Sequence, residues 1–157
     1  MSSDIFLDAG VFIGALLKGD SRHHEARSIV EEARAGRISA ATTIGILCEV
    51  YAALTWEKAQ PQHHPDEAAN AVYALVQTPS RIRLLAENEN ALDIMLHLAK
   101  SNNLHARRIH DARHAATAIA HGIKRVMTYD TGDWLHFEKD GLQIVDTEKT
   151  ETISRSK

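Results

Sequence analysis

Short apolar segments alternate with longer amphipathic segments along most of this 157-residue chain. Five of the short segments have the length and composition of β-strands, at residues 4–8, 38–43, 82–86, 124–130 and 142–147. The segments between them carry apolar residues at helical spacing. Because strands that alternate with helices are joined by crossover connections, the pattern predicts an α/β fold. We expect a central parallel sheet of four to five strands with helices on both faces.

The helical segments have recognisable starts and stops. Ser21 is a candidate N-cap for a helix that Gly36 ends, and Asp66 is a candidate N-cap for a helix over 66–77. The other helices are expected at residues 11–18, 43–59, 89–103 and 108–122. In the helix over 89–103, the apolar face is expected to consist of Leu92, Met95, Leu96 and Ala99.

The size of the chain fits a single domain, which we place at residues 1–148, followed by a polar tail at 149–157. No apolar run approaches the ~20 residues of a membrane span. The first residues lack the basic region of a signal peptide, so a cytoplasmic protein is expected. The lone Cys48, expected to lie in the core, excludes an internal disulfide and a Cys-rich zinc site. The net charge of −3 argues against a purely electrostatic nucleic-acid binder.

Acidic residues follow two of the predicted strands directly. Asp8 comes after the first strand and Asp130 after the fourth, with Asp133 three residues later. In open α/β sheets, functional residues collect beyond the carboxyl ends of the strands. Asp111 stands near the start of a helix, and Glu49 lies at the edge of an apolar helical face. Each acid alone has an ordinary explanation as a cap or turn residue, but one site could collect them all.

A pocket with four or five carboxylates needs a compensating cation, because the negative charges repel each other. Mg²⁺ and Mn²⁺ prefer oxygen ligands, bind substrate phosphates and activate water. The sequence therefore indicates metal-dependent hydrolysis of a phosphodiester.

Three blocks of sequence resemble the PIN-domain ribonucleases, and most closely the VapC-type toxins of bacterial toxin–antitoxin modules. The resemblance extends from residue 4 to about 147, and its blocks are IFLDAGVFIGALL, TTIGILCEVYAAL and HDARHAATAIAHGIKRVMTYDTGDW. It implies that Asp8, Glu49, Asp111 and Asp130 form an acidic quartet that binds one or two Mg²⁺ or Mn²⁺ ions. It also implies endonucleolytic cleavage of RNA, a homodimer and a small cognate antitoxin.

The chain departs from the family pattern after the first acid. A Thr, Ser or Asn is usual there, whereas this chain has Ala9-Gly10. A polar group from Thr42, Thr43 or Thr128 is a candidate substitute. Asp133 is a further candidate metal ligand, which shares or replaces the role of Asp130.

Basic residues cluster around the third acid of the quartet. Arg113-His114 replace the apolar residues that are often found after this acid, and the cluster is a candidate for contacts with RNA phosphates. The candidates are Arg107, Arg108, His110 and Arg113.

Other functions remain open at this point. His110-Asp111 matches the dyad of HD-domain phosphohydrolases, with His97 or His105 and Asp130 as its partners, but that fold is all-helical. A haloacid-dehalogenase-like phosphatase needs an acid where Gly10 stands. A non-catalytic RNA-binding or scaffold relative of the PIN family is the alternative from a different class.

Overall fold

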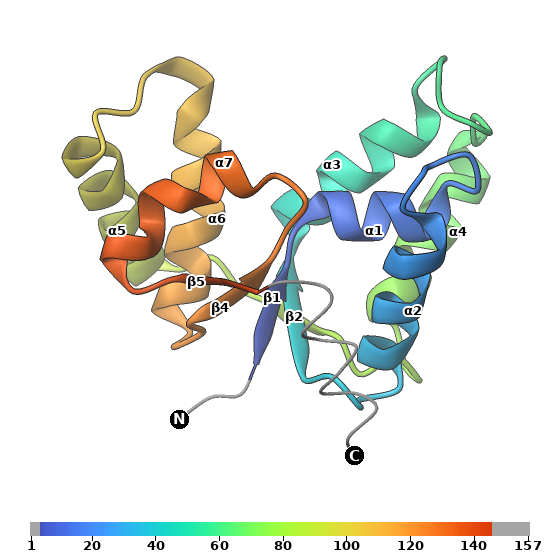
Figure 1. Cartoon of the computed structure of the whole chain (residues 1–157), viewed down its shortest axis with the longest axis horizontal. Helices are drawn as coiled ribbons and strands as arrows, with labels where there is room; N and C mark the ends of the chain where they lie inside the picture. Colours follow the sequence, from blue (N-terminus) through green and yellow to red (C-terminus); the bar gives the residue numbers. More distant parts are fainter. Residues whose placement is uncertain (1–3, 146–157) are drawn as a thin grey trace.

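A computed structural model describes residues 4–145, whose five strands form one sheet (Figure 1). The strand order is β3-β2-β1-β4-β5 and every neighbouring pair is parallel. The strands are β1 (Ile5–Leu7), β2 (Ala40–Thr43), β3 (Arg83–Leu85), β4 (Arg125–Met127) and β5 (Gln143–Val145). The predicted parallel sheet is thus confirmed, and it excludes the all-helical HD domain. Residues 146–147 of the last predicted strand and the predicted tail lie outside the described residues.

Seven α-helices and two 3₁₀ helices connect the strands within residues 4–145. The α-helices are α1 (Ala9–Leu16), α2 (His23–Arg34), α3 (Ile44–Thr55), α4 (Pro65–Val76), α5 (Glu89–Ser101), α6 (Ile109–Ala120) and α7 (Thr131–Trp134). The 3₁₀ helices are η1 (Ala106–Arg108) and η2 (Leu135–Asp140). Figure 1 shows α1–α4 on one side of the sheet and α5–α7 on the other. Right-handed crossovers produce this division, because the chain reverses its direction across the sheet after β3.

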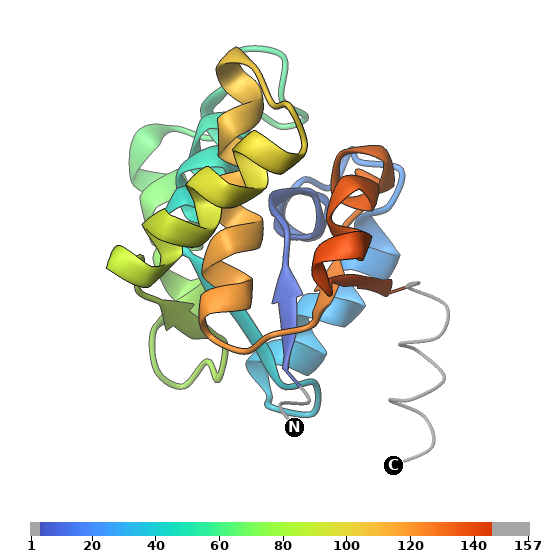
Figure 2. The same ribbon diagram turned by 90° about the vertical axis from the view of Figure 1, so that its left-hand side faces the viewer.

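The core lies between the sheet and these two helical layers. All three residues of β1 are buried, and Phe6 and Leu7 are completely inaccessible to solvent. On α6, Ala112, Ala115 and Ala116 belong to the core and have no exposed surface. The small alanine side chains let α6 approach its neighbours closely. Figure 2 shows α5 lying against α6, and the two helices are in contact.

Two predicted helix starts are wrong. The first residue of α2 is His23, and Arg22, not Ser21, is its N-cap. The side chain of Asp20 accepts a hydrogen bond from the Arg22 amide and so closes the preceding turn. The first residue of α4 is Pro65, and the side chain of His64 caps it in place of Asp66. Proline suits the first position of a helix because no backbone donor is needed there.

The predicted burial also differs at three places. In α5, Ala91 and Leu98 are buried, whereas Leu92 and Leu96 are 48% and 54% exposed. The helix has apolar residues on two sides, and its contact with α6 selects the side that contains Ala91 and Leu98. Cys48 is exposed rather than in the core.

No helix within residues 4–145 is both long and apolar enough for a membrane span.

Candidate metal centre

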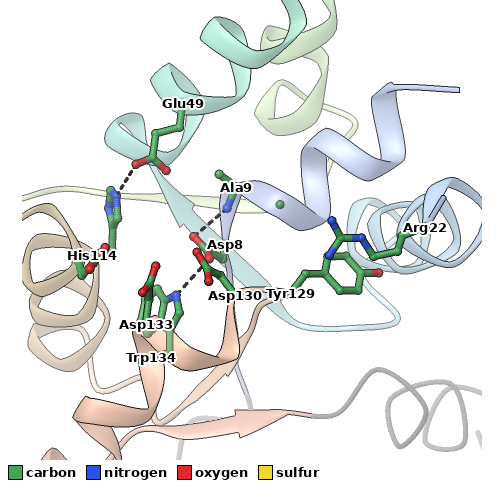
Figure 3. Close-up of a pocket in the computed structure, with 11 residues that line it drawn as sticks. Asp8, Ala9, Arg22, Glu49, His114, Tyr129, Asp130, Asp133 and Trp134 are labelled. Atoms are coloured by element: carbon green, nitrogen blue, oxygen red, sulfur yellow. Dashed lines mark hydrogen bonds and ion pairs between the residues drawn. The ribbon is translucent and has the colours of Figure 1, made fainter. Parts of the chain in front are cut away.

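A pocket of about 400 Å³ opens at the carboxyl ends of β1 and β4. These two strands are neighbours in the sheet, and the crossovers leave them toward opposite faces, so a crevice forms between them. All five predicted acidic residues line this pocket: Asp8, Glu49, Asp111, Asp130 and Asp133. They come from four segments of the chain, and Figure 3 shows how several of them lie.

Asp8 is held by three donors at the base of the pocket. Its Oδ1 accepts a hydrogen bond of 2.9 Å from the Ala9 amide, which caps α1. Its Oδ2 accepts hydrogen bonds from the Thr128 hydroxyl at 2.7 Å and from the Trp134 indole at 3.0 Å. Of the three candidate threonines, Thr128 is therefore the one that supplies a hydroxyl to the first acid. Thr42 instead donates to the Leu7 carbonyl, and Thr43 caps α3.

Glu49 approaches the pocket from α3 and contacts a buried histidine. The Nε2 atom of His114 lies 3.3 Å from Glu49 Oε1, and the side chains are 6% and 49% exposed, respectively. The Nδ1 atom of His114 is buried and has no hydrogen-bond partner among residues 4–145. A buried N–H without a partner costs more than an unused acceptor, so the proton belongs on Nε2. The Nε2–H group of His114 then donates to Glu49.

Asp111 lies in the first turn of α6. Burial raises the pKa of its carboxyl above the ordinary value, and the negative charges of Asp133 and Asp8 raise it further. Arg108 and His114 act in the opposite direction. The effect of Asp133 and Asp8 shows that Asp111 shares the electrostatic field of the other acids, although it is far from both in sequence.

Asp130 and Asp133 form a carboxyl pair at the start of α7. A hydrogen bond with Asp133 is the largest cause that raises the pKa of Asp130 from 3.8 to about 6, followed by burial and the charge of Asp133. Asp8 and Asp111 raise this pKa further. The Asp130 amide donates to the Thr128 hydroxyl at 2.9 Å, so Thr128 connects Asp130 to Asp8. One proton on the pair relieves the repulsion between like charges.

The carboxylates lie in one pocket, but several of them form hydrogen bonds with other side chains of the protein. No three acidic, histidine or cysteine side chains of residues 4–145 surround a common point as metal ligands in this state. Asp8 accepts hydrogen bonds from Thr128 and Trp134, and Asp130 is hydrogen-bonded to Asp133. Such an all-oxygen donor set with a raised carboxyl pKa fits a hard divalent cation, because the cation would replace the proton that now offsets the charge.

The four basic residues that the sequence suggested as phosphate contacts do not line this pocket. Arg113 Nε binds Glu87 Oε1 at 2.8 Å, and Arg108 contacts His136 at 2.8 Å. Arg107 and His110 are exposed on η1 and at the start of α6. Arg108 still lies close enough to Asp111 to lower its pKa. A role for these residues in binding RNA stays a prediction.

The pocket has lining residues that the sequence analysis missed. Arg22, Tyr129 and Trp134 contribute side chains, and the Arg22 guanidinium lies 4.2 Å from the centre of the Tyr129 ring. Tyr129 and Trp134 are next to predicted acids in sequence, which is a usable sign of proximity. Arg22 carries no such sign, because the loop between α1 and α2 reaches the pocket only through folding.

Comparison with known proteins identifies the fold. The sequence-family model of the PIN domain matches residues 5–139 of this chain. Among solved structures, VapC20 of Mycobacterium tuberculosis, a sarcin-ricin loop cleaving toxin, aligns with a TM-score of 0.61 and 17% identity over 88% of this chain and 96% of that chain. No curated protein matches the sequence significantly.

Two complexes with similar folds belong to toxin–antitoxin systems. A toxin–antitoxin complex from Klebsiella pneumoniae aligns with a TM-score of 0.60 and 16% identity over 91% of this chain and 97% of that chain. VapBC-5 of Mycobacterium tuberculosis aligns with a TM-score of 0.58 and 19% identity over 92% of this chain and 98% of that chain. At these identities the likeness shows the fold alone, and the family follows from the match to the PIN-domain model. The resemblance seen in the sequence blocks is confirmed, and the chain belongs to the PIN-domain family.

Proposed function

We propose that this protein is a metal-dependent endoribonuclease and the toxin of a toxin–antitoxin pair. One observation carries the proposal: five carboxylates from four separate segments of the chain line one pocket. Carboxylates held together in this way repel each other, and a bound cation is a compensation that suits a pocket of oxygen ligands.

Mg²⁺ or Mn²⁺ is the cofactor that suits this pocket. Asp8, Glu49, Asp111 and Asp130 would hold the metal, and Asp133 would assist or replace Asp130. When bound, such an ion binds a phosphate oxygen, lowers the pKa of a water molecule and stabilises the leaving oxygen.

The protein's own residues have distinct roles in this proposal. Thr128 and Trp134 fix the orientation of Asp8, and His114 fixes that of Glu49. The Asp130–Asp133 pair would release its proton when the charge of the pocket is compensated. The proposed hydrolysis uses water as the nucleophile, so no side chain of the pocket has to form a covalent bond with the RNA.

The proposed partners are an RNA substrate, a cognate antitoxin protein and a second copy of the chain, in the cytoplasm. Support for the antitoxin comes from structural neighbours that are themselves toxins or toxin–antitoxin complexes. Leu92 and Leu96 of α5 are exposed apolar residues of the kind that a homodimer would cover.

The test is cleavage of RNA by the purified protein in Mn²⁺ and in EDTA. We expect cleavage in Mn²⁺ only, and a loss of orders of magnitude in Asp8→Asn, which keeps the size of the side chain but removes its charge. Cleavage that persists in EDTA would contradict the metal-dependent mechanism.

Thermal unfolding separates the catalytic proposal from the scaffold alternative. A cation that binds the folded state alone raises the melting temperature by mass action. Mn²⁺ should therefore stabilise the wild type, and Asp8→Asn should lose most of this shift. A wild type that neither gains stability from Mn²⁺ nor cleaves RNA would favour a non-catalytic scaffold. The hydroxyl that Thr128 supplies to Asp8 weighs against an impaired site, despite Ala9-Gly10.

A further inference from the structure

Arg22 is the only Lys or Arg among the described residues that line the acidic pocket. A pocket rich in carboxylates repels the negatively charged phosphates of RNA. A nuclease with such a pocket therefore needs positive groups close to the phosphates. A cation bound among the acids compensates the charge at the scissile phosphate. The neighbouring phosphates need a positive group of their own, and the predicted basic residues lie outside the pocket.

The guanidinium of Arg22 is held in place by an aromatic ring. It lies 4.2 Å from the centroid of the Tyr129 ring, within the range of a cation–π interaction. Tyr129 directly precedes Asp130 in the sequence, so the aromatic ring that contacts Arg22 lies beside the acidic site. Figure 3 shows Arg22 and Tyr129 on one side of Asp8 and Asp130, with Glu49 and His114 on the other.

Most hydrogen-bonding capacity of Arg22 is unused. Its Nε lies 3.6 Å from Asp20 Oδ1, and the same oxygen already accepts a 2.8 Å hydrogen bond from the Arg22 amide. Within residues 4–145, no hydrogen bond to a protein group is formed by either terminal nitrogen of Arg22. The side chain is 45% exposed, so an incoming ligand can reach it. A stacked guanidinium keeps its edge free, and that edge matches two oxygens of a phosphate.

We propose that Arg22, supported by the ring of Tyr129, binds a phosphate of the RNA substrate beside the scissile phosphate. The inference rests on the proposed ribonuclease function and adds to it the direction in which the RNA leaves the pocket. Arg22 is thus a substrate-binding residue, and its contribution belongs to affinity rather than to the chemical step.

The experiment compares Arg22→Gln with wild type in steady-state cleavage of a short single-stranded RNA in Mn²⁺. Loss of one charge-assisted contact should raise KM about tenfold, with kcat within about twofold of wild type. Binding of the same RNA is then measured over a range of salt concentrations. The slope of log K against log salt should be smaller by about 0.7 in Arg22→Gln, the value for one phosphate contact on a single strand.

Two further variants make the result specific. Arg27→Gln removes a charge from an exposed, ion-paired arginine of α2, the helix that follows Arg22, and Arg27 does not line the pocket. It should leave KM and the salt slope unchanged. Arg22→Lys keeps the charge but not the planar fork, so it should restore the salt slope and only part of the affinity.

The outcomes separate this inference from the proposed function. A wild type that cleaves RNA, together with an Arg22→Gln variant of unchanged KM and salt slope, would overturn the role of Arg22 alone. An equal loss in Arg27→Gln would also overturn it, because the effect would then reflect overall charge. A wild type without cleavage in Mn²⁺ would overturn both proposals.

Discussion

At the scale of single residues, the Asp130–Asp133 pair shows how close carboxyl groups in the pocket retain a proton. The hydrogen bond between the two side chains raises the pKa of Asp130 to about 6. In the unfolded chain this carboxyl has its ordinary value of 3.8. Between these pH values the folded protein therefore holds the extra proton, and the contribution of this group to stability falls as the pH rises through that window.

Asp130→Asn should accordingly become more stable relative to wild type as the pH rises from about 4 to about 6 in EDTA. The difference between the two proteins cancels the titration of the carboxyls that do not interact with Asp130. Urea unfolding at closely spaced pH values measures it. A difference in unfolding free energy that stays flat over this range would show that the two carboxyls are not coupled.

His114 offers a second prediction at this scale. It places a buried donor 3.3 Å from Glu49, and groups that orient a metal ligand commonly contribute 10- to 100-fold to metal affinity. We expect His114→Leu to weaken Mn²⁺ binding about tenfold in calorimetric titration.

His114→Gln is the matched variant, since its amide can donate to the same carboxylate. It should recover part of the affinity for Mn²⁺. Equal losses of affinity in His114→Leu and His114→Gln would assign His114 to packing only.

At the scale of elements, the sequence predicted strands and helices better than it predicted their caps and faces. The strands at β1 and β4 were predictable because a short apolar run ends near an acid in both places. The exposed Leu92 and Leu96 could not be predicted, since α5 is apolar on two sides and only its contact with α6 decides which is buried. The short helix α7 was missed because Asp130, Gly132 and Asp133 are equally typical of a turn.

Helix α6 connects packing to function, because its alanine face determines where Asp111 points. Ala115→Leu would force extra volume into a position with no exposed surface. We expect it to destabilise the protein by about 1–3 kcal/mol in urea unfolding. Ala52→Leu on α3, where the side chain is exposed, is the control and should change stability by less than about 0.5 kcal/mol. Similar effects of the two substitutions would contradict the tight packing of α6.

At the scale of the whole molecule, the strand order brings the two ends of the described chain together. Asp8 and Asp133 are both in one pocket because β1 and β4 are neighbours. The meeting of Asp8 with Asp130 was predictable, since the carboxyl ends of parallel strands share one edge of the sheet. The place of Arg22 was not predictable, because it depends on how the loop between α1 and α2 folds back over Tyr129.

The most direct test of the metal-dependent ribonuclease compares two adjacent residues of α6. Asp111 lines the acidic pocket, whereas its neighbour His110 does not. In a cleavage assay with Mn²⁺, Asp111→Asn should lose activity by orders of magnitude while its melting temperature in EDTA stays close to that of wild type, and His110→Ala should lose far less. Full ribonuclease activity in Asp111→Asn would contradict the assignment of the acidic pocket as the active site.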